Sequence, residues 1–352
     1  MERVQTHRVI ALVEGLLRRR EFGPLVGLVV LILVFGNMSS HLWSRQQLNG
    51  ITSLSASIGI VAVGVTFLMI SGEFDLSVGA VFAISAVLFG KFIDNYGMSP
   101  WLAFPAMLAL AACIGLVNGL VTTRFGIPSF ITTLATLLVV QGVDLVISGG
   151  NTILYFGHNP LMNALGGTIP HTTLEYRVLW FIGLTAVLWF VLERTAYGNW
   201  SSSSGGRAGV ARAMGVRTRR VKTTNFVICS CCAALSGMLQ FASYGAASAQ
   251  DGQDYELLAI VAAVIGGTSL FGVTGTVIGT FIGALILGML QAGLILVGVP
   301  GDWYEPLIGV ILVVAVIVNV RLSKLELSTA FTRFAFAHRE DEPVAPVAER
   351  PS

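Results

Sequence analysis

The chain has 352 residues, of which 54% are hydrophobic and only 11% are charged. Soluble domains carry about 25% charged residues. This composition therefore excludes an ordinary soluble globule and indicates a protein whose solvent is membrane lipid. The net charge of +2 comes from short basic clusters beside apolar runs. That placement is typical of membrane topology signals, and nucleic acid is not an expected partner.

The apolar runs predict an all-α integral membrane protein with about ten transmembrane helices, because a helix needs about 20 apolar residues to cross a bilayer. In chain order the expected spans are residues 23–38, 51–71, 76–94, 100–121, 128–148, 176–193, 223–245, 255–272, 274–298 and 303–320. Residues 1–22 are expected to form a cytoplasmic or interfacial segment, residues 23–320 the transmembrane domain, and residues 321–352 a partly disordered cytoplasmic tail.

The basic residues predict the orientation of these spans. With the N-terminus in the cytoplasm, 18 of the 21 Lys and Arg residues lie on the cytoplasmic side, and only Arg45, Lys91 and Arg177 lie outside. The positive-inside rule favours this arrangement, which puts both termini in the cytoplasm. The longest cytoplasmic connection, residues 194–222, contains seven basic residues, and the longest external one is residues 149–175.

The segment from Ser71 to Gly79 interrupts apolar sequence with two carboxylates, Glu73 and Asp75. A charge at the bilayer centre costs about 2.5–3.5 kcal/mol, so these side chains are expected at an interface, in a cavity or buried in protein. Asp75 precedes an apolar helix, and its side chain could cap the free N–H groups there. The alternative is a helix break that lines a transport path or transmits motion.

Other polar side chains lie within the expected spans. Gln141 and Asp144 are one helical turn apart and would share a face, either as packing polarity or as a substrate contact. Asn118 and Thr133 also interrupt apolar runs, where hydroxyl and amide groups commonly join helices. The series Gly275-x3-Gly279-x3-Gly283 predicts close helix packing, either within one chain or between two copies.

Several motifs are absent from the sequence. No Walker A motif occurs, so we expect no ATP site and no enzymatic activity of the chain's own. The four cysteines lie in apolar runs without metal-ligand spacing, and the five histidines form no visible set. We therefore expect neither a bound metal nor a cofactor.

Three ordered motifs make the chain resemble the permease subunits of bacterial ABC importers for ribose, xylose and related monosaccharides, in the branched-chain amino acid/ribose permease superfamily. The motifs are Asp75-Leu76-Ser77-Val78-Gly79, Asn118-Gly119 with Ile127-Pro128-Ser129-Phe130-Ile131-x-Thr133-Leu134, and Tyr255-Glu256-Leu257-x-Ala259-Ile260-x-Ala262-Ala263-x-Ile265-Gly266-Gly267-Thr268-Ser269-Leu270. The chain departs from the family pattern at Glu73, which replaces a glycine, and at Arg207, which replaces an asparagine.

The resemblance implies a type II importer-like permease that works by alternating access. Its partners would be a separate ATPase that binds ATP and Mg²⁺, an extracytoplasmic sugar-binding protein, and a second permease copy, identical or related. The candidate pathway residues are Asp75, Ser77, Asn118, Phe130, Thr133 and Gln141. The candidate contacts to the ATPase are Gly205, Gly206, Ala211, Arg212 and Gly215 in the cytoplasmic connection.

Other hypotheses remain open at this point. The same kind of importer could carry nucleosides or another small solute, although a charged amino acid would need ionic partners that the spans scarcely offer. An ion-coupled carrier or channel acting alone is a different class, and it would transport its solute without ATP. A membrane-embedded enzyme is the weakest alternative, since no nucleophile or metal set is visible.

Overall fold

The computed structural model describes residues 21–157 and 159–317, and this part of the chain is mostly helical. Its α-helices are α2 (Phe22–Met38), α3 (Arg45–Ile70), α4 (Val78–Asp94), α5 (Pro100–Phe125), α6 (Ser129–Ser148), α7 (Pro160–Gly166), α8 (Tyr176–Arg194), α9 (Ala196–Gly205), α10 (Ala208–Ala213), α11 (Thr218–Tyr244), α12 (Tyr255–Ile265) and α13 (Val277–Leu296). A further helix starts at residue 304 and continues to residue 317. Two 3₁₀ turns, η1 (Ser40–Trp43) and η2 (Gly301–Trp303), precede α3 and this last helix. Most of the expected N-terminal segment and the whole C-terminal tail lie outside the described residues.

Six described helices are long and apolar enough to cross a membrane, namely α3, α5, α6, α8, α11 and α13. The other expected spans coincide with shorter helices. Helices α2 and α4 have 17 residues each and α12 has 11. One expected span, residues 255–272, is only partly helical because α12 ends at Ile265 before a glycine pair. The only strands in the described residues are β1 (Ile153–Leu154) and β2 (Ala246–Ala247), an antiparallel pair of two residues each.

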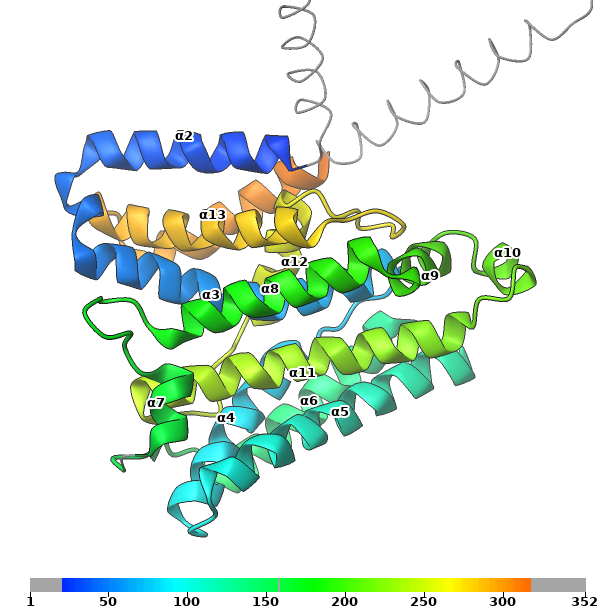
Figure 1. Ribbon diagram of the computed structural model, residues 1–352, viewed down its shortest axis with the longest axis horizontal. Helices are drawn as coiled ribbons and strands as arrows, with labels where there is room; N and C mark the ends of the chain where they lie inside the picture. Colours follow the sequence, from blue (N-terminus) through cyan, green and yellow to red (C-terminus); the bar gives the residue numbers. More distant parts are fainter. Residues whose placement is uncertain (1–20, 158, 318–352) are drawn as a thin grey trace, which may run out of the picture.

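Helix α3 lies at the centre of the bundle. It contacts α8, α11, α12 and α13, and Figure 1 shows it between the α2–α13 layer and the α11–α5 layer. Of its apolar stretch 94% is buried, against 22% in α6 and in α8. Small residues permit this packing: a Cβ on Gly59 would lie 2.2 Å from the ring of Phe181, and one on Gly64 would lie 2.9 Å from Cys232.

The glycine series of α13 packs within the chain. A Cβ added to Gly279 would lie 1.9 Å from the carbonyl oxygen of Gly266, and one on Gly283 would lie 2.0 Å from that of Ala262. The carbonyl of Ala262 lies in the last turn of α12, and that of Gly266 immediately follows the helix. Of the two roles expected for this series, the structure therefore supports packing between α12 and α13 of one chain.

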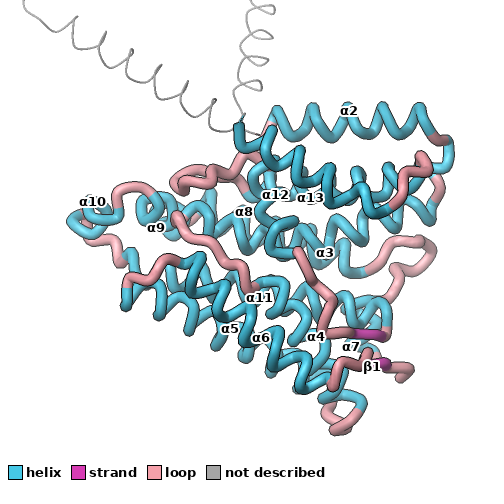
Figure 2. Tube along the Cα trace, turned by 180° about the vertical axis from the view of Figure 1, so that it is seen from behind, coloured by secondary structure: helices cyan, strands magenta, loops and turns pink. Residues whose placement is uncertain are grey.

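The connections gather at two opposite ends of the bundle. Helix α7 and strand β1 lie at one end, and α9 and α10 lie at the other (Figures 1 and 2). The connection of residues 194–222 is not an open loop, because it contains α9 and α10. Thr195 caps α9 by accepting a hydrogen bond from the N–H of Tyr197 at 3.2 Å. Within the serine run, the hydroxyl of Ser204 donates to the carbonyl of Trp200, which fits these polar residues into the helix.

Candidate functional site

The chain between α3 and α4 is non-helical over residues 71–77, a segment that we call the break, and it buries a carboxylate. The side chain of Asp75 is 1% exposed. Its Oδ1 accepts hydrogen bonds from the backbone N–H of Ser77 at 2.8 Å and from the Ser77 hydroxyl at 2.5 Å. Ser77 immediately precedes α4, so the carboxylate lies at the positive end of that helix. Within the described residues, Oδ2 of Asp75 has no hydrogen-bond partner.

Asn118 of α5 joins this carboxylate to α6. Its Nδ2 donates to the hydroxyl of Ser77 at 3.0 Å, and its Oδ1 accepts from the hydroxyl of Thr136 at 2.6 Å. Asn118 is fully buried. The nitrogen of its amide bonds to the break and the oxygen bonds to α6, so this single residue of α5 connects three elements.

The start of α6 satisfies backbone groups of the break. Thr133 accepts a hydrogen bond from the N–H of Leu76 at 3.0 Å, and Ser129 accepts one from the N–H of Phe74 at 3.2 Å. These side chains replace the helical partners that the break lacks. We use the term polar cluster for Asp75, Ser77, Asn118, Thr133 and Thr136.

The structure brings together four of the six pathway residues expected from the sequence, Asp75, Ser77, Asn118 and Thr133. Phe130 is 57% exposed on the outer face of α6. Gln141 is half-buried, and it makes no side-chain hydrogen bond within the described residues. Asp144, one turn further along α6, is fully buried, and neither of its carboxylate oxygens accepts a hydrogen bond from the described residues. Gln141 and Asp144 therefore do not form a joint polar site.

A second set of hydrogen bonds attaches α9 to the bundle. Asn225 of α11 is fully buried. Its Nδ2 donates to the carbonyl of Phe67 in α3 at 3.1 Å and to the hydroxyl of Ser201 at 3.1 Å, while its Oδ1 accepts from the hydroxyl of Tyr197 at 2.6 Å. Asn225 is not among the site residues expected from the sequence. An amide near the start of the apolar run 223–245 is the signal that could have found it.

The end of α9 packs closely on the end of α3. A Cβ on Gly205 would lie only 2.0 Å from the carbonyl oxygen of Ile70. The same carbonyl accepts a hydrogen bond from the N–H of Val273 at 2.9 Å, and Ser202 donates to the carbonyl of Val273. Gly206 ends α9 beside the Val273 side chain. Three segments distant in sequence thus meet at the break.

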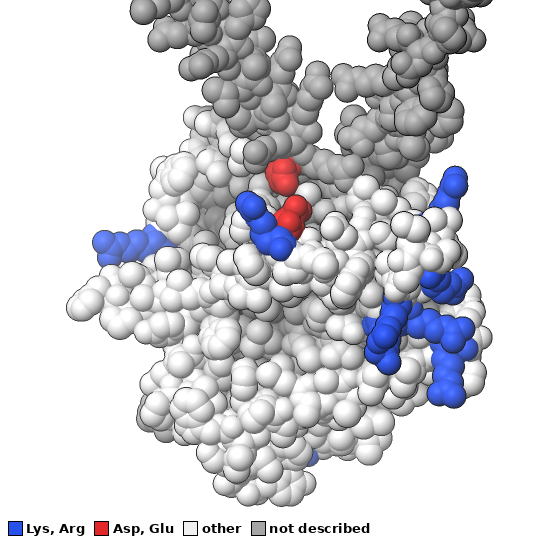
Figure 3. All heavy atoms as spheres, turned by 45° about the vertical axis from the view of Figure 1, so that its right-hand side comes forward, with Lys and Arg blue, Asp and Glu red and all other residues white. Residues whose placement is uncertain are grey.

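Helix α10 projects from the bundle among exposed arginines. Ala211 is buried at 6% exposure, and Gly215 ends the turn after α10 with a φ of +87°. Exposed basic side chains surround this turn: Arg207, Arg212, Arg217, Arg219 and Arg220. Figure 3 shows basic side chains gathered on this side of the molecule, where few acidic ones are visible. The positive field suits an acidic partner surface.

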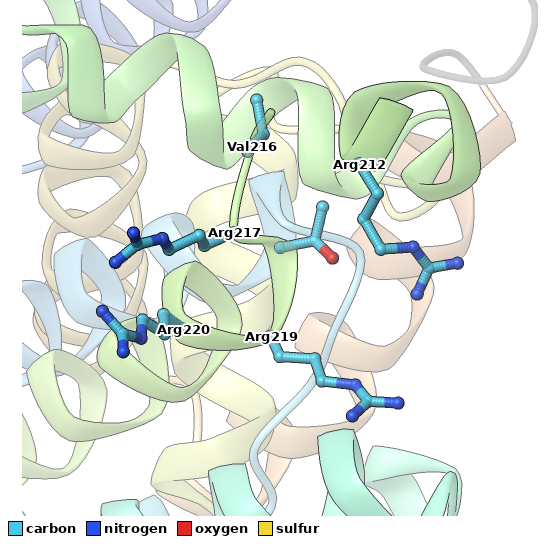
Figure 4. A pocket seen from close by; sticks show the side chains of 6 residues that line it. Arg212, Val216, Arg217, Arg219 and Arg220 are labelled. Carbon is cyan, nitrogen blue, oxygen red and sulfur yellow. The ribbon is translucent and has the colours of Figure 1, made fainter. Parts of the chain in front are cut away.

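A shallow hollow lies on this basic surface. It is lined by Arg212, Val216, Arg217, Thr218, Arg219 and Arg220. Figure 4 shows Arg212 and Arg219 pointing to one side and Arg217 and Arg220 to the other. The guanidinium groups therefore face outward and do not converge on one point.

Within the described residues, no three His, Cys, Asp or Glu side chains are placed to hold a metal ion.

Comparison with known proteins gives the family of the chain. The family model described as "Branched-chain amino acid transport system / permease component" matches residues 47–316. A ribose import permease protein of Bacillus subtilis is 32% identical over 328 residues, which are 92% of this chain and 99% of that protein. A fructose import permease protein of Rhizobium meliloti is 31% identical over 86% of both chains. A xylose/arabinose import permease protein of Sulfolobus acidocaldarius is 32% identical over 87% of this chain and 86% of its own length. No solved structure matches. The chain belongs to the branched-chain amino acid transport system permease component family.

Proposed function

We propose that this chain is the permease subunit of an ABC importer and carries a monosaccharide, of the ribose or xylose type, across the bacterial inner membrane. The observation that carries the proposal is the similarity, over nearly the whole chain, to import permeases for ribose, fructose and xylose/arabinose. The family match over residues 47–316 supports the same class.

The side chains of α6 fit a neutral cargo. Asp144 is the one ionisable residue of α6 and it is buried, so the exposed face of the helix offers apolar groups beside the half-buried amide of Gln141. An amide exchanges hydrogen bonds with the hydroxyls of a sugar without pairing charges. The exposed face of α6, with Phe130 and Gln141, would line the pathway against a second permease copy, identical or related, and the polar cluster behind it would hold α4, α5 and α6 in register.

The basic surface supports the assignment of a cytoplasmic end. In the proposed arrangement about ten spans cross the membrane, both termini lie in the cytoplasm, and a partner ATPase docks on α9 and α10. The contacts would come from Gly205, Gly206, Ala211, Arg212 and Gly215. The partner would bind ATP and Mg²⁺, so this chain would need no cofactor of its own, and an extracytoplasmic sugar-binding protein would deliver the cargo at the α7 end.

A pull-down of the tagged chain from native membranes in mild detergent tests this function. We expect a tandem-domain ATPase and a sugar-binding protein to co-purify, and ATP hydrolysis by the complex to rise when sugar is added. A known importer carried through the same procedure controls for loss of subunits in detergent. Recovery of the chain alone beside an intact control would favour an ion-coupled carrier. Stimulation by nucleosides in place of sugars would keep the class and change the cargo.

A further inference from the structure

An ion pair links the break to the start of α11. The Nζ of Lys222 lies 2.6 Å from Oε1 of Glu73, and the two side chains are 19% and 14% exposed. It is one of two ion pairs within the described residues. Because both groups are mostly withdrawn from water, their attraction is stronger than that of an exposed surface pair.

The Glu73 side of the ion pair is connected to the polar cluster through the backbone of the break. Glu73 is two residues before Asp75, and the N–H groups of Phe74 and Leu76 donate to Ser129 and Thr133 of α6. Displacement of Glu73 would therefore act on backbone groups that hold the cluster in place.

The Lys222 side of the ion pair is connected to α9 in the cytoplasmic connection, residues 194–222. Lys222 lies in the second turn of α11, one turn before Asn225, whose amide binds the side chains of Tyr197 and Ser201 in α9. Thus α9 and the start of α11 form one hydrogen-bonded body, and Lys222 is the side chain through which this body reaches Glu73.

The ion pair supplies a mechanical property that the nearby glycine contact lacks. A Cβ on Gly72 would lie 3.3 Å from the carbonyl oxygen of Gly205. Such a backbone contact resists closer approach of α9 and the break, whereas its weak dispersion attraction gives little resistance to their separation. Opposite charges resist separation. A shallow hollow lined in part by Glu73, Lys222 and Arg219 adjoins the pair, so water can solvate both groups when they part.

We propose that Glu73 and Lys222 are positioning residues that transmit motion of the α9–α10 connection to the polar cluster, so that ATP hydrolysis by the partner is coupled to opening of the pathway. This inference rests on the proposed function. Because opposite charges resist separation, the Glu73–Lys222 ion pair would draw the break along when the α9–α10 connection moves away from it. Neither residue needs to touch the sugar or the nucleotide.

The experiment uses the whole importer, co-purified from native membranes and reconstituted in liposomes with its ATPase and receptor. Uptake of D-[¹⁴C]ribose, or of D-[¹⁴C]fructose if ribose is not transported, is measured together with ATP hydrolysis. The variants are Glu73→Gln, Lys222→Gln, the double variant and the conservative Lys222→Arg. Arg124→Gln serves as the matched control. It removes an exposed cation whose side chain makes no hydrogen bond or ion pair with the described residues.

We expect each neutral variant to lower the sugar imported per ATP hydrolysed by about fivefold, within the range of couplings that single residues modulate. The double variant should lose no more than either single variant, since all three lack the same contact. Lys222→Arg and Arg124→Gln should keep the ratio of the unmodified importer. An unchanged ratio in both single variants, or losses that multiply in the double variant, would overturn the proposal. Absence of sugar uptake by the unmodified importer would instead refute the proposed function.

Discussion

Asn118 bonds through its one amide to two other members of the polar cluster. It partners Ser77 and Thr136, which lie on different elements, and it is fully buried. The sequence identified Asn118 as one polar residue in an apolar span, but not its partners, because they approach only when α4, α5 and α6 pack. Ser77 and Thr136 are 41 and 18 residues away along the chain.

Replacement of Asn118 by Leu is expected to destabilise the protein by about 1–3 kcal/mol, because Ser77 and Thr136 lose a buried partner. The thermal midpoint in detergent, followed by tryptophan fluorescence, measures the change. Asn37→Ala alters an exposed asparagine of α2 and should shift stability by no more than about 0.5 kcal/mol. Equal midpoints for the two variants would mean that the hydrogen bonds of Asn118 contribute no net stability.

Arg177 is a buried cation whose partners the sequence did not reveal. Its charge marks the external side in the topology argument, but its side chain is only 1% exposed. The guanidinium binds Glu175, donates to the hydroxyl of Ser57 at 3.0 Å, and lies 4.8 Å from the ring centre of Tyr244. Burial by itself would raise the pKa of Glu175, but the hydrogen bond and charge of Arg177 outweigh this effect and lower that pKa.

The variant Arg177→Met leaves Glu175 without its partner and should lose about 3 kcal/mol at neutral pH. A carboxylate with a lowered folded-state pKa contributes stability above its unfolded pKa and loses it as the pH falls through the folded value. The stability difference from the unmodified protein should therefore hold from pH 8 to pH 5 and shrink below about pH 4.3. Midpoints measured across this pH range, with the exposed Arg45→Met as control, test the account, and a pH-independent difference would contradict it.

At the scale of elements, apolar runs predicted where most helices lie, since hydropathy and length are local properties. They did not predict which helix would be central. Helices α3 and α6 have similar mean hydropathy, 2.1 and 2.0, yet α3 is almost wholly buried and α6 is mostly exposed. In lipid both environments favour apolar side chains, so composition does not distinguish them. The short helices α9 and α10 were also missed, because polar and basic residues there suggested an open loop.

The contact between α9 and the end of α3 is expected to tolerate no side chain at Gly205. Gly205→Ala places a methyl group 2.0 Å from the carbonyl of Ile70, so α9 must shift or the end of α3 must distort. We expect a loss of about 1–3 kcal/mol in stability from this overpacking. We also expect a several-fold fall in sugar-stimulated ATP hydrolysis by the complex.

The matched control for this substitution is Gly183→Ala in α8, where a Cβ meets no atom within 4 Å. Alanine is the better helix former, so this variant should be as stable as the unmodified chain or slightly more stable. If the two glycine variants behaved alike in midpoint and in ATP hydrolysis, close packing of α9 on α3 would not be needed for coupling.

At the scale of the whole molecule, the basic surface and the polar cluster lie on one continuous set of contacts. The exposed arginines flank α10, Asn225 holds α9 to α3 and α11, and the break joins α9 to the start of α6. The sequence motifs identified the two regions separately. Their connection could not be predicted, because it depends on contacts such as Lys222 with Glu73, 149 residues apart.

The most direct test of the account is sugar flux in liposomes that contain either this chain alone or the chain with its co-purified ATPase and receptor. We expect uptake of D-[¹⁴C]ribose or D-[¹⁴C]fructose only in the complete set, only with ATP enclosed on the ATPase side, and not in response to an ion gradient. Uptake by the chain alone, driven by a proton or sodium gradient without ATP, would contradict the importer assignment.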